Sequence, residues 1–202
     1  MSKTAKQWAL FIITVAAVLA LDQAAKQLVI SYLELSESWA PIPALGDYLL
    51  ITRSYNTGAA FGMFPLASNL FLLLALITII AFVVAYPRLP ARARLSRLSI
   101  ALIAGGALSN AVDRIRLDHV VDYVHVQVSP GFANISNFAD HAITLGVILL
   151  LIDQWRAEPE RRREDQAVED KRGPSREPPD TPPVPPEPDR TQPDPLSRQD
   201  IP

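Results

Sequence analysis

The apolar residues of this chain gather in four blocks and are not spread along it as in a soluble core. The blocks cover residues 8–21, 69–86, 98–112 and 138–155. The second block carries no charge and is long enough to cross a bilayer, for which a helix needs about 20 apolar residues. The first block reaches that length only if its helix continues to Leu33. The pattern predicts a mainly α membrane protein with four transmembrane helices.

The first block is open to a second interpretation. An apolar stretch that follows Lys3 and Lys6 is also compatible with a cleavable secretory signal. Asp22 and Lys26 argue against cleavage, because they form a favourable pair four residues apart that continues the helix. We therefore expect a retained first helix with both charged residues at a membrane edge.

The segment after the first helix has a different character. It contains a β-like run at residues 47–55, which is followed by the glycine-rich sequence NTGAAFG at 56–62. Strand-like runs beside turn-forming residues favour a small sheet. We expect a β-cradle on the membrane surface from residues of about 40–65.

Basic residues are distributed unevenly between the loops. They precede the first helix, lie between the second and third helices, and follow the fourth: Lys3, Lys6, Arg88, Arg92, Arg94, Arg97, Arg156 and Arg161–Arg163. Loops rich in Lys and Arg stay in the cytoplasm. Both termini are therefore predicted to be cytoplasmic, and the two remaining loops face the outside.

The mean hydropathy of +0.15 is low for a membrane protein because the C-terminal segment is polar. Residues 157–202 hold 12 of the 18 prolines, 12 acidic and 8 basic residues, and no aromatic residue. Such a composition cannot bury enough apolar surface to order itself. We expect a folded domain at 1–156 and a disordered, proline-rich cytoplasmic tail at 157–202.

Composition also limits the chemistry. The chain has no cysteine, which excludes disulfides, thiolate metal sites and cysteine nucleophiles. Its histidines, His119, His125 and His141, do not follow a metal-binding spacing. No metal site is expected.

Polar residues recur on one face of the third helix. Gly106, Asn110, Asp113 and Arg114 follow one another at i, i+4, i+7 and i+8. One interpretation is a structural ion pair between Asp113 and Arg114, with Gly106 permitting close helix packing. The other is that the planar fork of Arg114 holds a substrate carbonyl or carboxylate.

Two further aspartates flank the space between the third and fourth helices. Asp122 lies in the apolar, strand-like sequence VVDYVHV, where a lone carboxylate is desolvated. Asp140 lies in the first turn of the fourth helix, behind Ser136 or Asn137 as N-cap, and a carboxylate there is also explained by the helix dipole. If the two meet, one keeps a proton and the other ionises, as in an aspartic protease.

Five motifs occur in order along the chain: LDQAAK at 21–26, NTGAAFG at 56–62, GGALSNAVDR at 105–114, VVDY at 120–123 and NFAD at 137–140. Together they resemble the motifs of the lipoprotein signal peptidases, also called signal peptidase II, which are bacterial membrane aspartic proteases. The resemblance covers residues 1 to about 156 and leaves out the tail.

This resemblance implies cleavage of prolipoproteins before a diacylglyceryl-modified cysteine, in the plasma membrane and without a cofactor. It implies Asp122 and Asp140 as catalytic residues. Substrate-binding or supporting residues would be Asp22, Lys26, Asn56, Gly106, Asn110, Asp113, Arg114 and Asn137. Expected partners are the prolipoproteins, membrane lipids and inhibitors of the globomycin type, and nucleic acid is not among them.

Two positions depart from the family pattern. Ser109 stands where the family usually has a glycine. Serine is small enough that we expect this position to tolerate it. Ser136 replaces a usual aromatic residue before Asn137 and removes an apolar contact near Asp140.

Two other classes of protein remain open on the residues alone. A proton-coupled membrane protein would carry charges in the middle of several helices, whereas here they cluster at one end. A membrane scaffold could instead use the proline-rich tail to recruit a partner.

Overall fold

The computed structural model describes residues 3–58, 67–90, 93–129 and 132–172. The chain divides into two compact units, Met1–Pro159 and Glu160–Pro202. The α-helices of the described residues are α1 (Lys3–Tyr32), α2 (Ala67–Ala85), α3 (Arg94–Leu117) and α4 (Phe138–Arg172). Each contains a segment that is long and apolar enough to cross a membrane. This confirms the four predicted spanning helices.

Two helices extend beyond the apolar blocks of the sequence. Helix α1 continues through Asp22 and Lys26 to Tyr32, as spanning length requires. Helix α4 continues to Arg172, past residue 157 where the predicted tail begins. Many residues of this stretch are Glu, Arg, Gln and Ala, which favour helix and outweigh its low hydrophobicity. The rest of the predicted tail, residues 173–202, lies outside the described residues.

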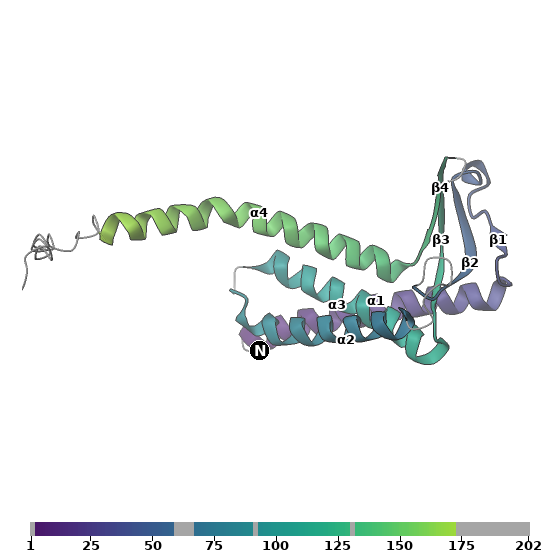
Figure 1. The fold of residues 1–202 in the computed structure, drawn as a ribbon, viewed down its shortest axis with the longest axis horizontal. Helices are drawn as coiled ribbons and strands as arrows, with labels where there is room; N and C mark the ends of the chain where they lie inside the picture. The colour runs from purple at the N-terminus through teal and green to yellow at the C-terminus, as the bar shows by residue number, and fades with distance from the viewer. Residues whose placement is uncertain (1–2, 59–66, 91–92, 130–131, 173–202) are drawn as a thin grey trace, which may run out of the picture. The chain divides into compact units, whose positions relative to one another are not determined.

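Helix α3 is the central helix of the first unit. Of its spanning window 72% is buried, compared with 6% for α2. Glycines permit this packing: a Cβ at Gly105 would lie 2.9 Å from the Cβ of Val18 in α1, and a Cβ at Gly106 would meet Ala139 of α4. Figure 1 shows α1, α2 and α3 side by side, with the sheet beyond one end of them.

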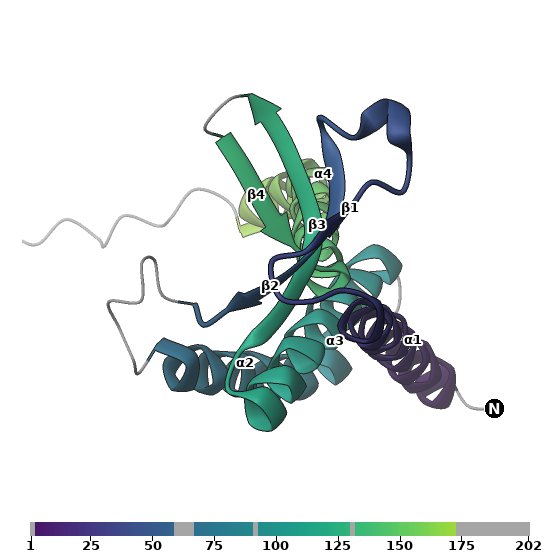
Figure 2. The same cartoon turned by 90° about the vertical axis from the view of Figure 1, so that its right-hand side faces the viewer.

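The sheet joins both segments that were predicted to face the outside. Its strands are β1 (Ser38–Trp39), β2 (Leu49–Asn56), β3 (Val120–Ser129) and β4 (Phe132–Ser136), in the order β1-β2-β3-β4 with antiparallel neighbours. Strand β2 matches the predicted β-like run. However, β3 and β4 come from the segment between α3 and α4, so the β-cradle is not confined to residues 40–65. Figure 2 shows β3 running from the end of α3 to its hairpin with β4.

An aromatic cluster packs the same unit where α1 begins and α2 ends. The rings of Trp8 and Phe11 lie 5.2 and 4.8 Å from the ring of Tyr86. Tyr86 is fully buried, and its hydroxyl donates a hydrogen bond of 2.8 Å to the carbonyl of Gln7. The cluster ties α1 to the end of α2.

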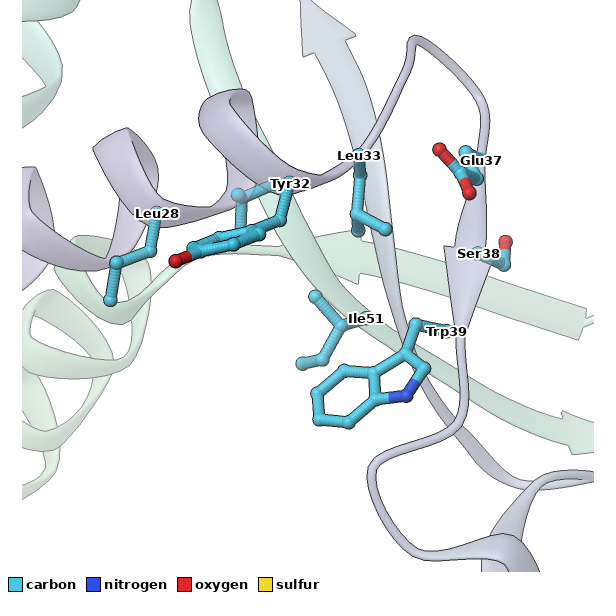
Figure 3. A pocket seen from close by; sticks show the side chains of 8 residues that line it. Leu28, Tyr32, Leu33, Glu37, Ser38, Trp39 and Ile51 are labelled. Atoms are coloured by element: carbon cyan, nitrogen blue, oxygen red, sulfur yellow. The ribbon is translucent and has the colours of Figure 1, made fainter.

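A groove of about 540 Å³ opens between the C-terminal end of α1 and strands β1 and β2. Most of its lining is apolar: Leu28, Val29, Tyr32, Leu33, Trp39 and Ile51, with Glu37 and Ser38 at one side (Figure 3). The groove therefore continues the apolar surface of α1 onto the sheet. Neither Asp122 nor Asp140 lines it.

Candidate functional site

Asp122 lies in β3, opposite Ser54 of β2, and is only 2% exposed. Each of its carboxylate oxygens accepts a hydrogen bond from an asparagine amide. Asn56 donates to Oδ2 at 2.8 Å, and Asn137 donates to Oδ1 at 2.6 Å. The carboxyl group is thus withdrawn from water and fixed by amides from two different elements.

This environment changes the proton affinity of Asp122. Burial away from water raises the pKa of Asp122 to about 6, and the charge of Asp140 acts in the same direction. The hydrogen bonds from Asn56 and Asn137 and the charge of Lys26 oppose the rise. The pKa of Asp122 therefore lies near the pH at which an enzyme usually works, as suits a general acid or base.

Asn137 begins α4 as its N-cap, one of the two residues that the sequence favoured. Its side-chain Oδ1 accepts a hydrogen bond of 2.9 Å from the backbone N–H of Asp140. The same side chain donates through Nδ2 to Asp122. One residue therefore starts the helix of Asp140 and holds the carboxylate of Asp122.

Asn110 of α3 completes a connection between the two aspartates. Its Nδ2 donates to Oδ1 of Asp140 at 2.8 Å. Its Oδ1 accepts hydrogen bonds from Asn137 Nδ2 at 3.3 Å and from Lys26 Nζ at 3.0 Å. A continuous path of side-chain hydrogen bonds thus runs from Asp122 through Asn137 and Asn110 to Asp140.

Lys26 lies at the centre of a buried ion cluster next to this path. Its Nζ is 2.6 Å from Asp22 Oδ2 and 2.7 Å from Asp113 Oδ2, and the three side chains are no more than 3% exposed. Asp22 also accepts from the backbone N–H of Ala139, and Asp113 from that of Val121, both at 3.1 Å. The cluster therefore holds the residues that directly precede Asp140 and Asp122.

This arrangement overturns the ion pair that the sequence suggested for Asp113 and Arg114. Asp113 pairs with Lys26, across helices. The guanidinium of Arg114 lies over the ring of Phe71 at 5.5 Å, and its Nη1 donates to the carbonyl of Asn110 at 3.3 Å. Its buried Nε has no hydrogen-bond partner among the described residues. The fork of Arg114 thus keeps donor capacity beside the aspartates.

Ser109 contributes to the ion cluster. Its hydroxyl donates to Asp22 Oδ2 at 2.7 Å and accepts from Gln23 Nε2 at 3.0 Å. Gln23 Nε2 also lies 2.7 Å from Asp113 Oδ1. The serine therefore adds a link that glycine cannot make. Sequence reasoning missed Gln23, because nothing in its position along α1 indicates that it has three partners on α3, namely Ser109, Asp113 and Arg116.

The other predicted residues take less direct positions. Gly106 faces Ala139, where it allows α3 to approach the first turn of α4. Ser136 ends β4 immediately before the cap residue. The loop NTGAAFG is described only from Asn56 to Gly58, and its residues 59–62 lie outside the described ranges.

The histidines are used in separate contacts. His125 lies 2.9 Å from the hydroxyl of Thr52, His141 lies 2.6 Å from the carbonyl of Asn137, and His119 stacks on Tyr55. In the described ranges, no three His, Asp or Glu residues are arranged to hold a metal ion.

Known proteins match this chain over the same region. The model of the signal peptidase II family matches residues 14–156. The lipoprotein signal peptidase of Geobacillus thermodenitrificans is 38% identical over 77% of this chain and 96% of its own length. That of Anoxybacillus flavithermus is 39% identical over 72% of this chain and 84% of its own length.

A solved structure agrees with these relatives. A bacterial membrane enzyme determined by the in meso method at 2.3 Å resolution superposes with a TM-score of 0.63. It is 28% identical and covers 73% of this chain and 88% of its own. The chain belongs to the signal peptidase II family, the membrane proteases that cleave signal peptides from prolipoproteins.

Proposed function

We propose that this chain is an aspartic endopeptidase whose catalytic pair is Asp122 and Asp140. The observation that carries the proposal is the hydrogen-bond path through Asn137 and Asn110 that joins the two carboxyl groups. Two carboxyl groups in one buried network share a proton, because both cannot ionise easily.

A shared proton is what peptide hydrolysis needs. The ionised carboxylate accepts a proton from water while the water oxygen attacks the carbonyl carbon of the scissile bond. The protonated partner donates a hydrogen bond to the carbonyl oxygen, which carries growing negative charge. When the carbon–nitrogen bond breaks, the nitrogen takes up a proton from the pair. The products are a carboxyl group and an amine, and the pair returns to its original state.

The surrounding residues have distinct roles in this proposal. Asn56, Asn110 and Asn137 orient the two carboxyl groups, and Gly106 permits the close approach of α4. Asp22, Lys26 and Asp113 form the frame that holds both neighbouring backbone segments. Arg114 supplies the unused donors next to the pair, and we assign it to a carbonyl group of the substrate.

The substrate proposal is cleavage before a diacylglyceryl-modified cysteine. Asp122 lies at the start of β3 and Asp140 at the start of α4, where a spanning helix meets the sheet. The unequal distribution of basic loops supports the proposal that this end lies outside the cytoplasm and both termini inside. A substrate whose lipid chains remain in the bilayer then presents its cleavage site at the depth of the pair. A globomycin-type cyclic peptide would compete for the same position.

The test follows cleavage of a diacylglyceryl-modified prolipoprotein by the purified full chain in micelles, with mass spectrometry of the released peptide. Wild type is compared with Asp122→Asn and Asp140→Asn. Asp47→Asn is the matched control, because Asp47 is an exposed carboxylate outside the site. A thermal unfolding measurement on each variant then tests whether it is folded.

We expect wild type and Asp47→Asn to cleave before the lipidated cysteine. Asp122→Asn and Asp140→Asn, the two variants of the catalytic pair or dyad, should each lose at least about a thousandfold in cleavage rate, since each carboxyl group performs a proton transfer. A folded Asp122→Asn or Asp140→Asn variant that retains activity would remove that residue from the catalytic pair. A folded wild type that leaves this substrate intact would overturn the proposed specificity.

A further inference from the structure

The first turn of α4 has all of its backbone N–H groups bound, although no preceding turn exists to bind them. The N–H of Asp140 bonds to the side chain of Asn137 and that of His141 to its carbonyl. The N–H of Ala139 bonds to Asp22. The remaining group, the N–H of Phe138, donates at 3.2 Å to the phenolic oxygen of Tyr123.

Tyr123 directly follows Asp122 in β3, and this creates a two-point attachment. Asp122 binds the side chain of Asn137, and Tyr123 binds the backbone of Phe138. Two consecutive residues of the strand therefore hold two consecutive residues at the start of the helix. These two contacts add to those of Asp22 with Ala139 and of Asn110 with Asp140, and they tie the start of α4 directly to β3 at two successive points.

We propose that Tyr123 is a positioning residue for the catalytic pair, which sets where Asp140 lies relative to Asp122. This inference rests on the proposed function, because the pair gains its chemistry from that separation. Reacting groups must be held within a fraction of an ångström of their productive geometry. The hydrogen bond from Phe138 supplies this constraint two residues before Asp140.

The phenol is suited to this role because it stays neutral. Tyr123 is 7% exposed. Burial raises the pKa of Tyr123 to about 12, and the charges of Asp22, Asp122 and Asp140 act in the same direction, while the hydrogen bond from Phe138 acts against it. At any pH suitable for an assay the oxygen is therefore an uncharged acceptor. Replacing Tyr123 by Phe removes this acceptor and leaves the charge of the site unchanged.

The sequence contains no local sign of this contact. An aromatic residue after Asp122 is compatible with simple packing in the strand. The contact becomes visible only when β3 and the beginning of α4 are seen together, since 15 residues separate Tyr123 from Phe138.

The experiment compares Tyr123→Phe with Tyr86→Phe in the full chain. Tyr86 is the matched control, because it is also buried and its hydroxyl also makes one hydrogen bond to the backbone, in the aromatic cluster with Trp8 and Phe11. For each variant kcat and KM are measured from pH 4.5 to 8.5, together with the thermal unfolding midpoint. Asp122→Asn and Asp140→Asn are assayed in parallel.

We expect Tyr123→Phe to lower kcat by about three- to tenfold with KM changed less than about twofold, the range that one neutral hydrogen bond supports. The alkaline limb of its pH profile, where the pair loses its shared proton, should move to lower pH, because a less constrained α4 reduces both the burial of Asp122 and the effect of Asp140. Other charged groups around Asp122 stay in place: Asp22, Lys26, Asp113 and Arg114. Tyr86→Phe should change the unfolding midpoint only.

The outcomes separate this inference from the proposed function. If both dyad variants are inactive and Tyr123→Phe behaves as Tyr86→Phe does in kcat and pH profile, the positioning role is wrong and the catalytic pair stands. If the dyad variants are active, the proposed function fails, and the positioning role fails with it. A lowered unfolding midpoint for Tyr123→Phe without a kinetic change would mark a structural contact and also overturn the inference.

Discussion

Gly106 lies where α3 packs against the first turn of α4, and a methyl group there has no room. A Cβ at this position would lie 2.7 Å from Cγ1 of Ile143 and would also collide with the carbonyl oxygen of Ala139. Ordinary contact begins at 3.4 Å, so the shortfall at Ile143 is about 0.7 Å. Ile143 can adjust its side chain, but Ala139 is backbone. Gly106→Ala therefore displaces the start of α4.

That displacement acts on Asp140, which follows Ala139. A misplacement of about 1 Å in an active site can cost about a hundredfold in rate. We expect Gly106→Ala to lower kcat by about 10- to 100-fold in the prolipoprotein cleavage assay. Overpacking should also cost about 1–3 kcal/mol of stability. A stability change alone does not distinguish a damaged site from a damaged fold, so the control must reproduce the overpacking.

Gly105→Ala provides that control. A Cβ at Gly105 would lie 2.9 Å from the Cβ of Val18, so this variant also overpacks a helix contact, but at α1 and not at α4. We expect a similar fall in the unfolding midpoint with a loss of kcat below about threefold. Equal kinetic losses in the two variants, or full activity in a folded Gly106→Ala, would refute the link between this contact and the catalytic pair.

Two further predictions concern charge. Lys26→Met leaves Asp22 and Asp113 buried without their cation, and we expect it to cost about 3–5 kcal/mol of stability. Adding Asp113→Asn should recover part of this loss. The unfolding midpoints of the single and the double variant test this, and an unchanged midpoint for Lys26→Met contradicts it. The pKa of Asp122 is higher in the folded protein, at about 6, than its ordinary value of 3.8. The protonated carboxyl group therefore contributes its full stabilisation below pH 3.8, and this stabilisation is lost as the pH rises through about 6. Relative to Asp122→Asn, wild type should therefore lose about 2 kcal/mol between pH 4 and pH 7, from about 1.4 kcal/mol per unit of pKa change. A pH-independent difference between their unfolding midpoints would count against the buried carboxyl.

The helices and one face of the site were predictable because their signals are local. An apolar run of spanning length predicts a helix wherever it occurs, and the spacing of Gly106, Asn110 and Asp113 places them on one face. The N-cap was predictable to within two residues, Ser136 or Asn137, from their position before an apolar run. In each case the determining residues lie within a few turns of one another.

The remaining features depend on contacts between distant parts of the chain. Nothing in Asp113 and Arg114 indicates that the partner of Asp113 is Lys26, which lies 87 positions earlier. In the same way, a strand-like VVDYVHV does not reveal that it pairs with β2. Helix α4 was placed too short because charged helix-forming residues resemble those of a disordered tail.

The buried ion cluster and the proposed catalytic pair depend on each other. Asp22 and Asp113 carry two negative charges against the single positive charge of Lys26, so the cation alone does not compensate them. The N–H groups of Ala139 and Val121 supply further donors, and these groups precede Asp140 and Asp122. Buried carboxylates without such donors are costly. The cluster is therefore fully satisfied only when β3 and α4 are in place, and the same assembly joins the two carboxyl groups of the proposed catalytic pair to one hydrogen-bond path.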